Sequence, residues 1–220
     1  MDKNKQAIAY MQDNKFEEAA ALFTEVIEEQ PNDPVGYINF GNLLLHVNDQ
    51  ERAQRFFEKA IELDEKAATA YYGLGNLYVE QANYGKAQVN YQKAIELGLE
   101  EADVYYMLGM TFLQQEHDKL ALPYLLRAAE LAPEDEEILF QYGLALAQSD
   151  HISDAGSVFD KVIRLNEAHS DAHYNLGVIA LFEDKVNKGL EHFDRALEAQ
   201  PDHVLAQNGK KNAEQLLSEM

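Results

Sequence analysis

Histidine and carboxylate side chains are the residues of this chain that could do acid–base or metal chemistry. The chain contains seven histidines, and only His169 and His173 lie four residues apart, a spacing that puts two side chains on one helix face. Metal binding would need a third ligand, for which Asp171 is the nearest candidate. The interpretation that we favour is that His173 takes the place of a packing aromatic side chain and His169 is solvated. The sequence then predicts no metal site and no cofactor.

Carboxylates are too frequent in this chain for their spacing to indicate catalysis. Asp and Glu number 39, and the run PEDEE at residues 133–137 is typical of a solvated turn that leads into the acidic first turn of a helix. The absence of cysteine excludes disulfides, zinc–cysteine sites and cysteine nucleophiles. The chain also lacks a phosphate-binding glycine loop, a Gly-x-Ser-x-Gly turn and a His-Glu-x-x-His helix. We therefore predict that the protein is not an enzyme.

Charge and hydropathy exclude several other classes. The 220 residues are 46% hydrophobic and carry a formal net charge of −21, so the chain repels nucleic acid and anionic membrane surfaces. No run of 18 apolar residues could span a bilayer, and residues 1–30 do not follow the pattern of a signal peptide. These features predict a soluble cytoplasmic protein that does not bind nucleic acid or membranes.

The chain repeats itself every 34 residues. Five glycines share one phase: Gly41, Gly75, Gly109, Gly143 and Gly177. A small residue follows each of them twelve positions later: Ala53, Ala87, Ala121, Ala155 and Gly189. Four positions further on comes a large side chain: Phe57, Tyr91, Leu125, Phe159 and Phe193. Because so many independent columns keep one period without an insertion, the pattern indicates a repeat architecture.

Each period has the pattern of two helices. In residues 34–67, apolar side chains of the first half recur at helical spacing, Asn48 and Asp49 offer turn and N-cap chemistry, and a second apolar stripe begins at Ala53. Glycine on the first helix and alanine on the second let two antiparallel backbones approach closely. The large side chain then fills the space towards the next pair. The sequence predicts an all-α protein of twelve helices in six pairs, with no strand.

The segments YYGLGNLYVEQANYGKAQVNYQKAIEL (71–97) and YYMLGMTFLQQEHDKLALPYLLRAAELAPED (105–135) resemble tetratricopeptide (TPR) repeats, with the family's aromatic, Leu-Gly, Tyr, Ala, Phe, Ala and Pro pattern. As a whole, the chain resembles the short TPR-only cytoplasmic proteins of Gram-positive bacteria. The resemblance implies a right-handed superhelical solenoid of six repeats, at residues 1–33, 34–67, 68–101, 102–135, 136–169 and 170–203.

Two further features concern irregularities of this pattern. Residues 204–220 have apolar side chains at helical spacing, and we predict a thirteenth helix that caps the last repeat, with a recruitment or dimerisation helix as the alternative. Gly209 is its expected weak point, since glycine within a helix costs about 1 kcal/mol.

Pro123 lies about one turn into the second helix of the fourth repeat, where an early-helix proline is tolerated or bends the helix.

The resemblance also implies where a ligand would bind. In TPR stacks the first helices line the concave face, and the second, fifth, sixth, ninth, twelfth and thirteenth places of each repeat usually point into it. From these columns we predict fifteen partner-binding residues: Ile38, Asn39, Asn42, Tyr72, Asn76, Asp103, Tyr106, Met107, Met110, Glu137, Phe140, Gln141, Asp171, Tyr174 and Asn175. Aromatic rings suit peptide recognition, and the amides could hold a peptide backbone.

These residues predict a protein or peptide segment as the partner, with apolar side chains and with basic ones opposite the acids. Some TPR domains clamp an acidic C-terminal chaperone tail with lysine, arginine and asparagine; of the corresponding places here, Ile38, Asn42, Gly73, Asp103 and Met107, only Asn42 matches. Such a tail is therefore not the expected ligand. The favoured function is a non-enzymatic adaptor, monomeric or weakly self-associating. The alternatives are a self-associating structural solenoid and a regulatory module of a larger enzyme complex.

Overall fold

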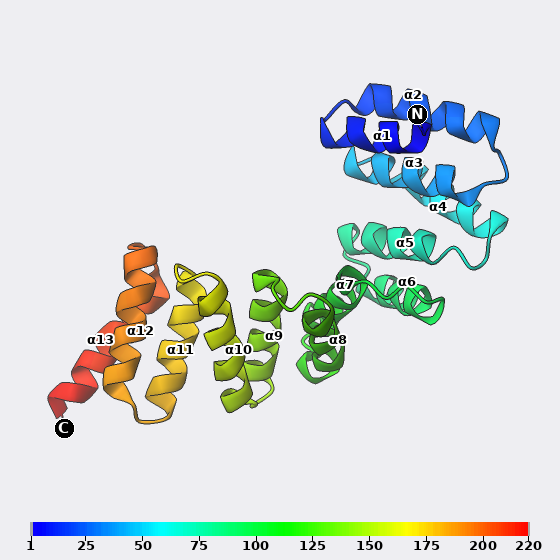
Figure 1. The fold of residues 1–220 in the computed structure, drawn as a ribbon. Helices are drawn as coiled ribbons and strands as arrows, with labels where there is room; N and C mark the ends of the chain where they lie inside the picture. Colours follow the sequence, from blue (N-terminus) through cyan, green and yellow to red (C-terminus); the bar gives the residue numbers. More distant parts are fainter. Residues whose placement is uncertain (1, 220) are drawn as a thin grey trace. The chain divides into compact units, whose positions relative to one another are not determined.

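The computed structural model describes residues 2–219, which form thirteen α-helices and no strand, as the sequence predicts (Figure 1). The helices are α1 Lys3–Gln12, α2 Phe16–Glu29, α3 Pro34–His46, α4 Gln50–Leu63, α5 Ala68–Glu80, α6 Tyr84–Glu96, α7 Ala102–Leu113, α8 Asp118–Leu131, α9 Glu136–Gln148, α10 Ile152–Leu165, α11 Ser170–Phe182, α12 Val186–Ala199 and α13 Val204–Glu219. No helix within residues 2–219 is both long and apolar enough to cross a membrane.

The chain divides into two compact units. The N-terminal unit takes Met1–Gln115 and holds α1 to α7, whereas the C-terminal unit takes Glu116–Met220 and holds α8 to α13. The division falls in the turn between α7 and α8, inside the fourth repeat that the sequence predicts. Within each unit, consecutive helices pack against one another, most extensively as the pairs α3–α4, α5–α6, α9–α10 and α11–α12.

Aromatic side chains of the second helices fill the space between successive first helices. Phe57 of α4 is fully buried, and a Cβ atom built on Gly41 of α3 or on Gly73 of α5 would lie 2.8 or 2.4 Å from its ring. Only residues without a side chain leave room for a ring at such distances. The predicted role of the large residue after the alanine is confirmed for Phe57, and the repeated glycine makes room for the ring rather than for the backbone of the second helix.

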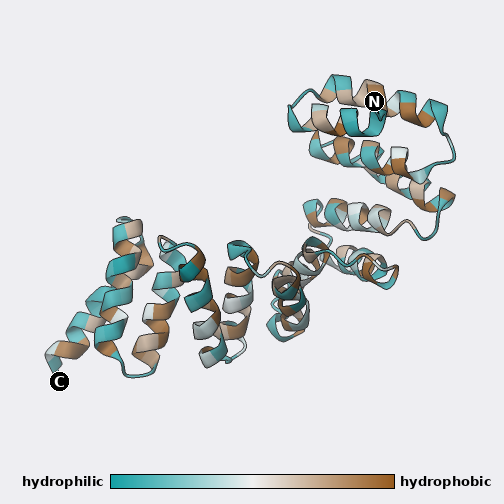
Figure 2. Ribbon diagram, in the orientation of Figure 1, coloured by the Kyte–Doolittle hydropathy of each residue, from teal (hydrophilic) through white to brown (hydrophobic). Residues whose placement is uncertain are grey.

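Amphipathic helices bring these rings together. In Figure 2, hydrophilic and hydrophobic residues alternate around most helices. On the second helices the small and large residues of the repeat columns face inwards, so that Ala53, Ala87 and Ala155 are fully buried, as are Tyr91 and Phe159. Burial of such apolar area is the main favourable contribution to folding.

Turn chemistry separates the helices at the predicted places. Asn48 adopts a positive φ of 61°, and the Asp49 carboxylate next to it accepts the Arg52 N–H, which caps α4. Asp33 caps α3 and Asp135 caps α9 in the same way. Pro123 lies within α8, which continues through it to Leu131.

The thirteenth helix covers the end of the C-terminal unit. It packs on α12 and α11, and it buries Ala206 and Ala213 completely beside Phe193. The sequence predicts only a helix-weakening effect of Gly209, but this glycine also makes room for a neighbouring aromatic ring. A Cβ atom there would lie 2.6 Å from the Phe193 ring, so the glycine lets the last ring of the repeat pattern pack under α13.

Candidate protein-binding surface

Each unit has what we call its first-helix face, and the predicted binding residues belong to the helices of these two faces. The face of the N-terminal unit is formed by α1, α3, α5 and α7, and that of the C-terminal unit by α9, α11 and α13. First helices contact one another directly as the pairs α1–α3, α3–α5 and α5–α7 in the N-terminal unit and as the pair α11–α13 in the C-terminal unit. The second helices lie behind them and supply the aromatic rings between them.

In the N-terminal unit, hydrogen bonds within the protein already hold two of the predicted amides. Asn39 donates to the Asn4 side chain at 3.2 Å, and Asn76 accepts the Tyr91 hydroxyl at 2.7 Å. Tyr72 packs against the Tyr91 ring with centroids 5.8 Å apart, and burial raises the pKa of the Tyr72 hydroxyl. These side chains therefore contribute to the packing between helices as well as to the surface.

The other predicted residues of this unit differ in exposure. Ile38 is buried against Ala60, Ala67 and Ala70, so it forms part of the core rather than an open binding position. Asn42 and Asp103 are exposed, whereas the following three are partly buried: Tyr106, Met107 and Met110. An aliphatic side chain has no polar group to keep in water, which accounts for the inward position of Ile38.

On α9 of the C-terminal unit, the predicted aromatic residue is also buried. Phe140 is 9% exposed and packs between Phe159 and His169, with ring centroids 5.7 and 4.7 Å away. Glu137 is exposed and accepts a hydrogen bond of 3.0 Å from the Gln141 amide. The acid and the amide thus lie on the surface, while Phe140 supports it from beneath.

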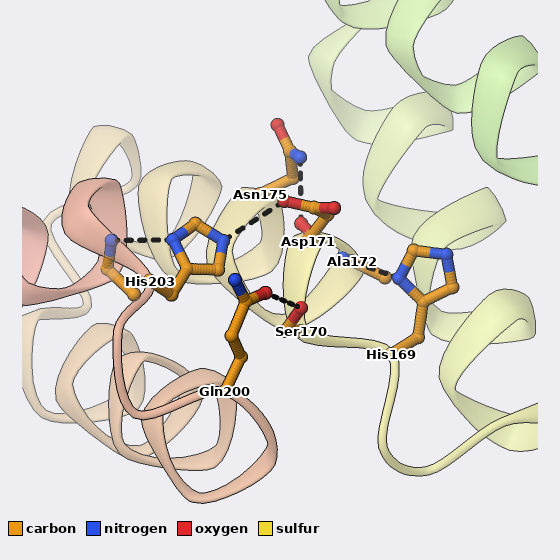
Figure 3. Close-up of polar contacts among 8 residues, drawn as sticks. His169, Ser170, Asp171, Ala172, Asn175, Gln200 and His203 are labelled. Atoms are coloured by element: carbon orange, nitrogen blue, oxygen red, sulfur yellow. Dashed lines mark hydrogen bonds and ion pairs between the residues drawn. The ribbon is translucent and has the colours of Figure 1, made fainter.

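A polar cluster connects the starts of α11 and α13 (Figure 3). His203 is 6% exposed; its Nδ1 accepts the Ala206 N–H at 3.2 Å, and its Nε2 lies 3.0 Å from Asp171 Oδ1. Because Nδ1 accepts, the neutral ring carries its proton on Nε2 and donates it to the Asp171 carboxylate. Asn175 donates to the backbone carbonyl of Asp171 at 2.8 Å. The cluster fixes the N-terminus of α13 against α11.

His169 makes the same cap one repeat earlier. Its Nδ1 accepts the Ala172 N–H at 3.2 Å, and its ring packs on Phe140. The expectation that His169 is solvated is therefore wrong: the side chain is partly buried and caps α11. An imidazole ring is long enough to satisfy a helix N–H and broad enough to cover a neighbouring aromatic ring.

A groove of about 550 Å³ lies between α11 and α13. Its lining residues are Tyr174, Val178, Leu181, Phe182, Phe193, Leu205, Asn208, Gly209, Asn212 and Leu216. Phe182 is 76% exposed and Leu205 55%, so these two side chains are open to solvent, whereas Phe193 is fully buried beneath them. None of the lining residues is charged. Exposed apolar surface is a common feature of protein interaction sites.

His173 has the predicted packing role. It is buried, and its ring faces His192 of α12 with the two Nδ1 atoms 3.2 Å apart, while its Nε2 lies 3.1 Å from the Glu167 carbonyl oxygen. A carbonyl can only accept, so neutral His173 carries its proton on Nε2 and His192 donates from Nδ1. Burial lowers the pKa of both rings, and each of them is therefore held neutral. Residues 2–219 contain no group of three side chains suited to a metal ion.

Family models described as tetratricopeptide repeat match residues 72–136 and 140–204. Two further models with the same description match residues 22–55 and 5–35. The matches together span most of the chain. The chain belongs to the tetratricopeptide repeat family.

Similar proteins agree with this assignment. The TPR repeat-containing protein YrrB of Bacillus subtilis is 51% identical over 41 residues, which are 19% of this chain and 20% of that protein, so this match spans about a fifth of the relative. A crystal structure of YrrB, described as a TPR protein with an unusual peptide-binding site, is 47% identical with a TM-score of 0.80 and covers 86% of this chain and 97% of that one. Pseudomonas aeruginosa PilF has the same TM-score at 16% identity, covering 96% of each chain, and shares the fold.

The TPR fold is a module for protein–protein interaction, and proteins composed of TPR repeats alone are generally non-enzymatic scaffolds. The sequence prediction stopped at the sixth repeat and so missed the residues that α13 contributes to the groove. Continuing the TPR phase by one more helix would have placed Leu205, Asn208, Gly209 and Asn212 at the second, fifth, sixth and ninth places. The neighbouring Val178 and Phe182 belong to the ninth and thirteenth places of the sixth repeat.

Proposed function

We propose that this protein is a cytoplasmic, non-enzymatic adaptor that holds a segment of another protein on its first-helix faces. The observation that carries the proposal is the groove between α11 and α13, whose uncharged lining includes the exposed side chains of Phe182 and Leu205. TPR proteins bind protein or peptide partners, and the YrrB structure is described by its peptide-binding site. Both facts support a groove that receives a peptide segment.

The charges on the first-helix faces of the two units support a partner with basic side chains. Asp103, Glu137 and Asp171 are exposed on first helices, and none of the fifteen predicted binding residues carries a positive charge. Complementary charges at the edge of an interface mostly accelerate encounter. An acidic segment would instead meet repulsion from these carboxylates and from the net charge of −21.

The test is affinity purification from native lysate with wild type and three variants of the full chain, followed by quantitative mass spectrometry. Tyr106→Ala changes the N-terminal unit's first-helix face, and Tyr174→Ala changes the groove of the C-terminal unit. Lys161→Ala, on the second helix α10, is the control. We expect a partner that wild type and Lys161→Ala retain equally and that at least one tyrosine variant loses, with a binding cost of about 2 kcal/mol or more.

Each variant is first compared with wild type by thermal unfolding, so that only folded forms enter the comparison. Equal recovery of every enriched protein by all three variants would exclude the first-helix faces as the binding surface. A sizing column at two concentrations distinguishes the adaptor from a self-associating solenoid, because only the solenoid elutes earlier at the higher concentration.

A further inference from the structure

We infer that the groove between α11 and α13 binds its partner as an extended segment, with apolar side chains at alternate positions and a basic residue at the end near Asp171. This inference rests on the proposed function of the first-helix face and specifies the conformation and the chemistry of the ligand. It also makes α13, which covers the last repeat, one wall of a binding site.

Two amides of α13 carry the inference. Asn208 and Asn212 are exposed and line the groove, and neither side chain has a hydrogen-bond partner within residues 2–219. They lie four residues apart on one helix face, on either side of Gly209. A carboxamide offers both donors and an acceptor, so each can pair with the N–H and C=O groups of a peptide backbone.

The spacing of the amides matches an extended chain. Four residues of α-helix rise by about 6 Å. Two residues of an extended strand advance by about 6.6 Å, and backbone groups two residues apart point to the same side. Asn208 and Asn212 can therefore pair with successive outward-facing backbone groups of one extended segment. A bound helix would leave both amides unused, because its backbone groups already bond internally.

The length and lining of the groove agree with this occupant. From Leu205 to Leu216 the helix α13 rises by about 16 Å, the length of about five extended residues. Val178 and Phe182 of α11 form the opposite wall, and they would contact the side chains that alternate towards it. The ligand thus has an apolar residue at every second position.

The carboxylate of Asp171 determines which residue type the bound segment has at one end. The ten lining residues are uncharged, and an acid, Asp171, lies next to one end of the groove, where His203 links it to the start of α13 and its side chain is 57% exposed. Its Oδ1 accepts from His203, and its second oxygen has no partner within residues 2–219. His203 also packs on Tyr174 at the same end of the groove, with ring centroids 5.4 Å apart. A lysine or arginine at this end of the segment would pair with the carboxylate.

The experiment measures fluorescence anisotropy of a labelled nonapeptide titrated with the full chain. The probe has leucine or phenylalanine at alternate positions, threonine between them and a lysine at each end. A second peptide has the same residues reordered so that the apolar ones lie three and four apart, and a third has glutamate at both ends. The first variant combines Asn208→Ala and Asn212→Ala in one chain, and the second is the groove variant Phe182→Ala. The control is Asn187→Ala, which changes an exposed asparagine of α12 outside the groove.

We expect the alternating peptide to bind at least tenfold more tightly than the reordered peptide and several-fold more tightly than the glutamate peptide. The double asparagine variant should weaken binding about tenfold or more, Phe182→Ala should weaken it too, and Asn187→Ala should leave it unchanged. Equal affinity of the alternating and reordered peptides, or wild-type affinity of the double asparagine variant, would overturn the extended conformation.

The outcomes separate this inference from the proposed function. If Phe182→Ala weakens both peptides and the asparagine variant weakens neither, the groove binds protein segments but not in the extended mode. Failure of wild type to bind any of the three peptides overturns the inference, whereas recovery of a lysate partner still decides the adaptor function. Concentration-dependent self-association that Phe182→Ala removes would assign the groove to a second copy and would also overturn the inference.

Discussion

The two units place different side chains at equivalent places of the repeat. In the N-terminal unit, Tyr37 packs against Phe56 with ring centroids 6.0 Å apart. Four periods later, His173 faces His192 with centroids 5.5 Å apart. The two rings of each pair thus lie at a similar distance. The Tyr37–Phe56 pair does not titrate near neutral pH, whereas histidine is the side chain that ordinarily titrates in this range.

The helix caps and the amides also differ in chemistry from one repeat to the next. At one repeat place Asp33 caps α3 and Asp135 caps α9, whereas His169 and His203 cap α11 and α13. Asn76 of the N-terminal unit is bonded to Tyr91, whereas Asn208 of the C-terminal unit has no partner within residues 2–219. The repeat therefore determines where side chains lie, and the residue type at each place determines whether they serve packing or remain available to a ligand.

The largest effects should come from the glycines under the aromatic rings. A Cβ atom on Gly75 would lie 2.3 Å from the Tyr91 ring, which its hydrogen bond to Asn76 holds in place. On Gly177 it would lie 2.6 Å from Phe193, which has no such bond. We expect Gly75→Ala to reduce the free energy of unfolding by about 2–3 kcal/mol and Gly177→Ala by about 1–2 kcal/mol, because crowding a packed core is destabilising.

Urea unfolding of the full chain measures these differences, and Gly85→Ala is the matched control. No atom lies within 4 Å of a Cβ built on Gly85 in α6, so alanine there should stabilise the chain by about 0.5 kcal/mol. A cost at Gly75 no greater than that at Gly85 would show that the rings move aside freely and would remove the packing role of the repeated glycine.

The histidine pair predicts a pH dependence confined to the C-terminal unit. Burial lowers the pKa of His173 and His192 below the ordinary value of 6.5, so the unfolded chain binds protons that the folded unit does not. The stability is fully present above pH 6.5 and is lost as the pH falls through the lowered pKa values. At pH 5.5 the loss is at most about 1.4 kcal/mol for each histidine, since that pH lies one unit below the ordinary value.

Thermal unfolding at pH 7.5 and 5.5 measures this loss. The matched variant carries His173→Tyr and His192→Phe, which restore the aromatic pair found at Tyr37 and Phe56. We expect a smaller decrease in Tm on acidification for this variant than for wild type. The same decrease in both would mean that groups other than this histidine pair account for the acid sensitivity.

A smaller effect is expected from the hydroxyl of Tyr91. Phe159 and Phe193 occupy the same place in the C-terminal unit without a hydroxyl, so Tyr91→Phe makes the N-terminal unit resemble it. The change removes one hydrogen bond of 2.7 Å to Asn76, for which we expect a loss of about 1 kcal/mol in urea unfolding. In an Asn76→Ala background the same change should cost clearly less, and an equal cost would show that the two side chains do not interact.

The sequence predicted the fold well because its strongest columns are the ones that packing requires. The 34-residue spacing of glycine, alanine and a large residue predicts helix pairs and buried rings, and within the two units the pairs α1–α2, α3–α4, α5–α6, α9–α10 and α11–α12 pack together over buried rings such as Phe57. Asn48 and Asp49 predicted a turn because their side chains and backbone preferences act locally.

The candidate site was less predictable because one repeat place holds side chains of different chemistry. At the fifth place Tyr72 is only partly buried, whereas Ile38 and Phe140, which have no hydroxyl to keep near water, are buried. The cap by His169 depends on the distance from its ring to a backbone N–H, which composition and periodicity do not contain. The α13 residues that line the groove could be predicted only by continuing the 34-residue phase beyond the sixth repeat.

The most direct test of the difference between the units is an NMR spectrum of the ¹⁵N-labelled full chain that shows the side-chain amide signals of its asparagines. It is recorded as the alternating nonapeptide with lysine ends is added. The structure predicts that the amide signals of Asn208 and Asn212 shift, because they are open to a backbone, and that those of Asn39 and Asn76 stay in place, because they already bond within the protein. Shifts at Asn39 and Asn76 without shifts at Asn208 and Asn212 would contradict the account and move the binding surface to the N-terminal unit.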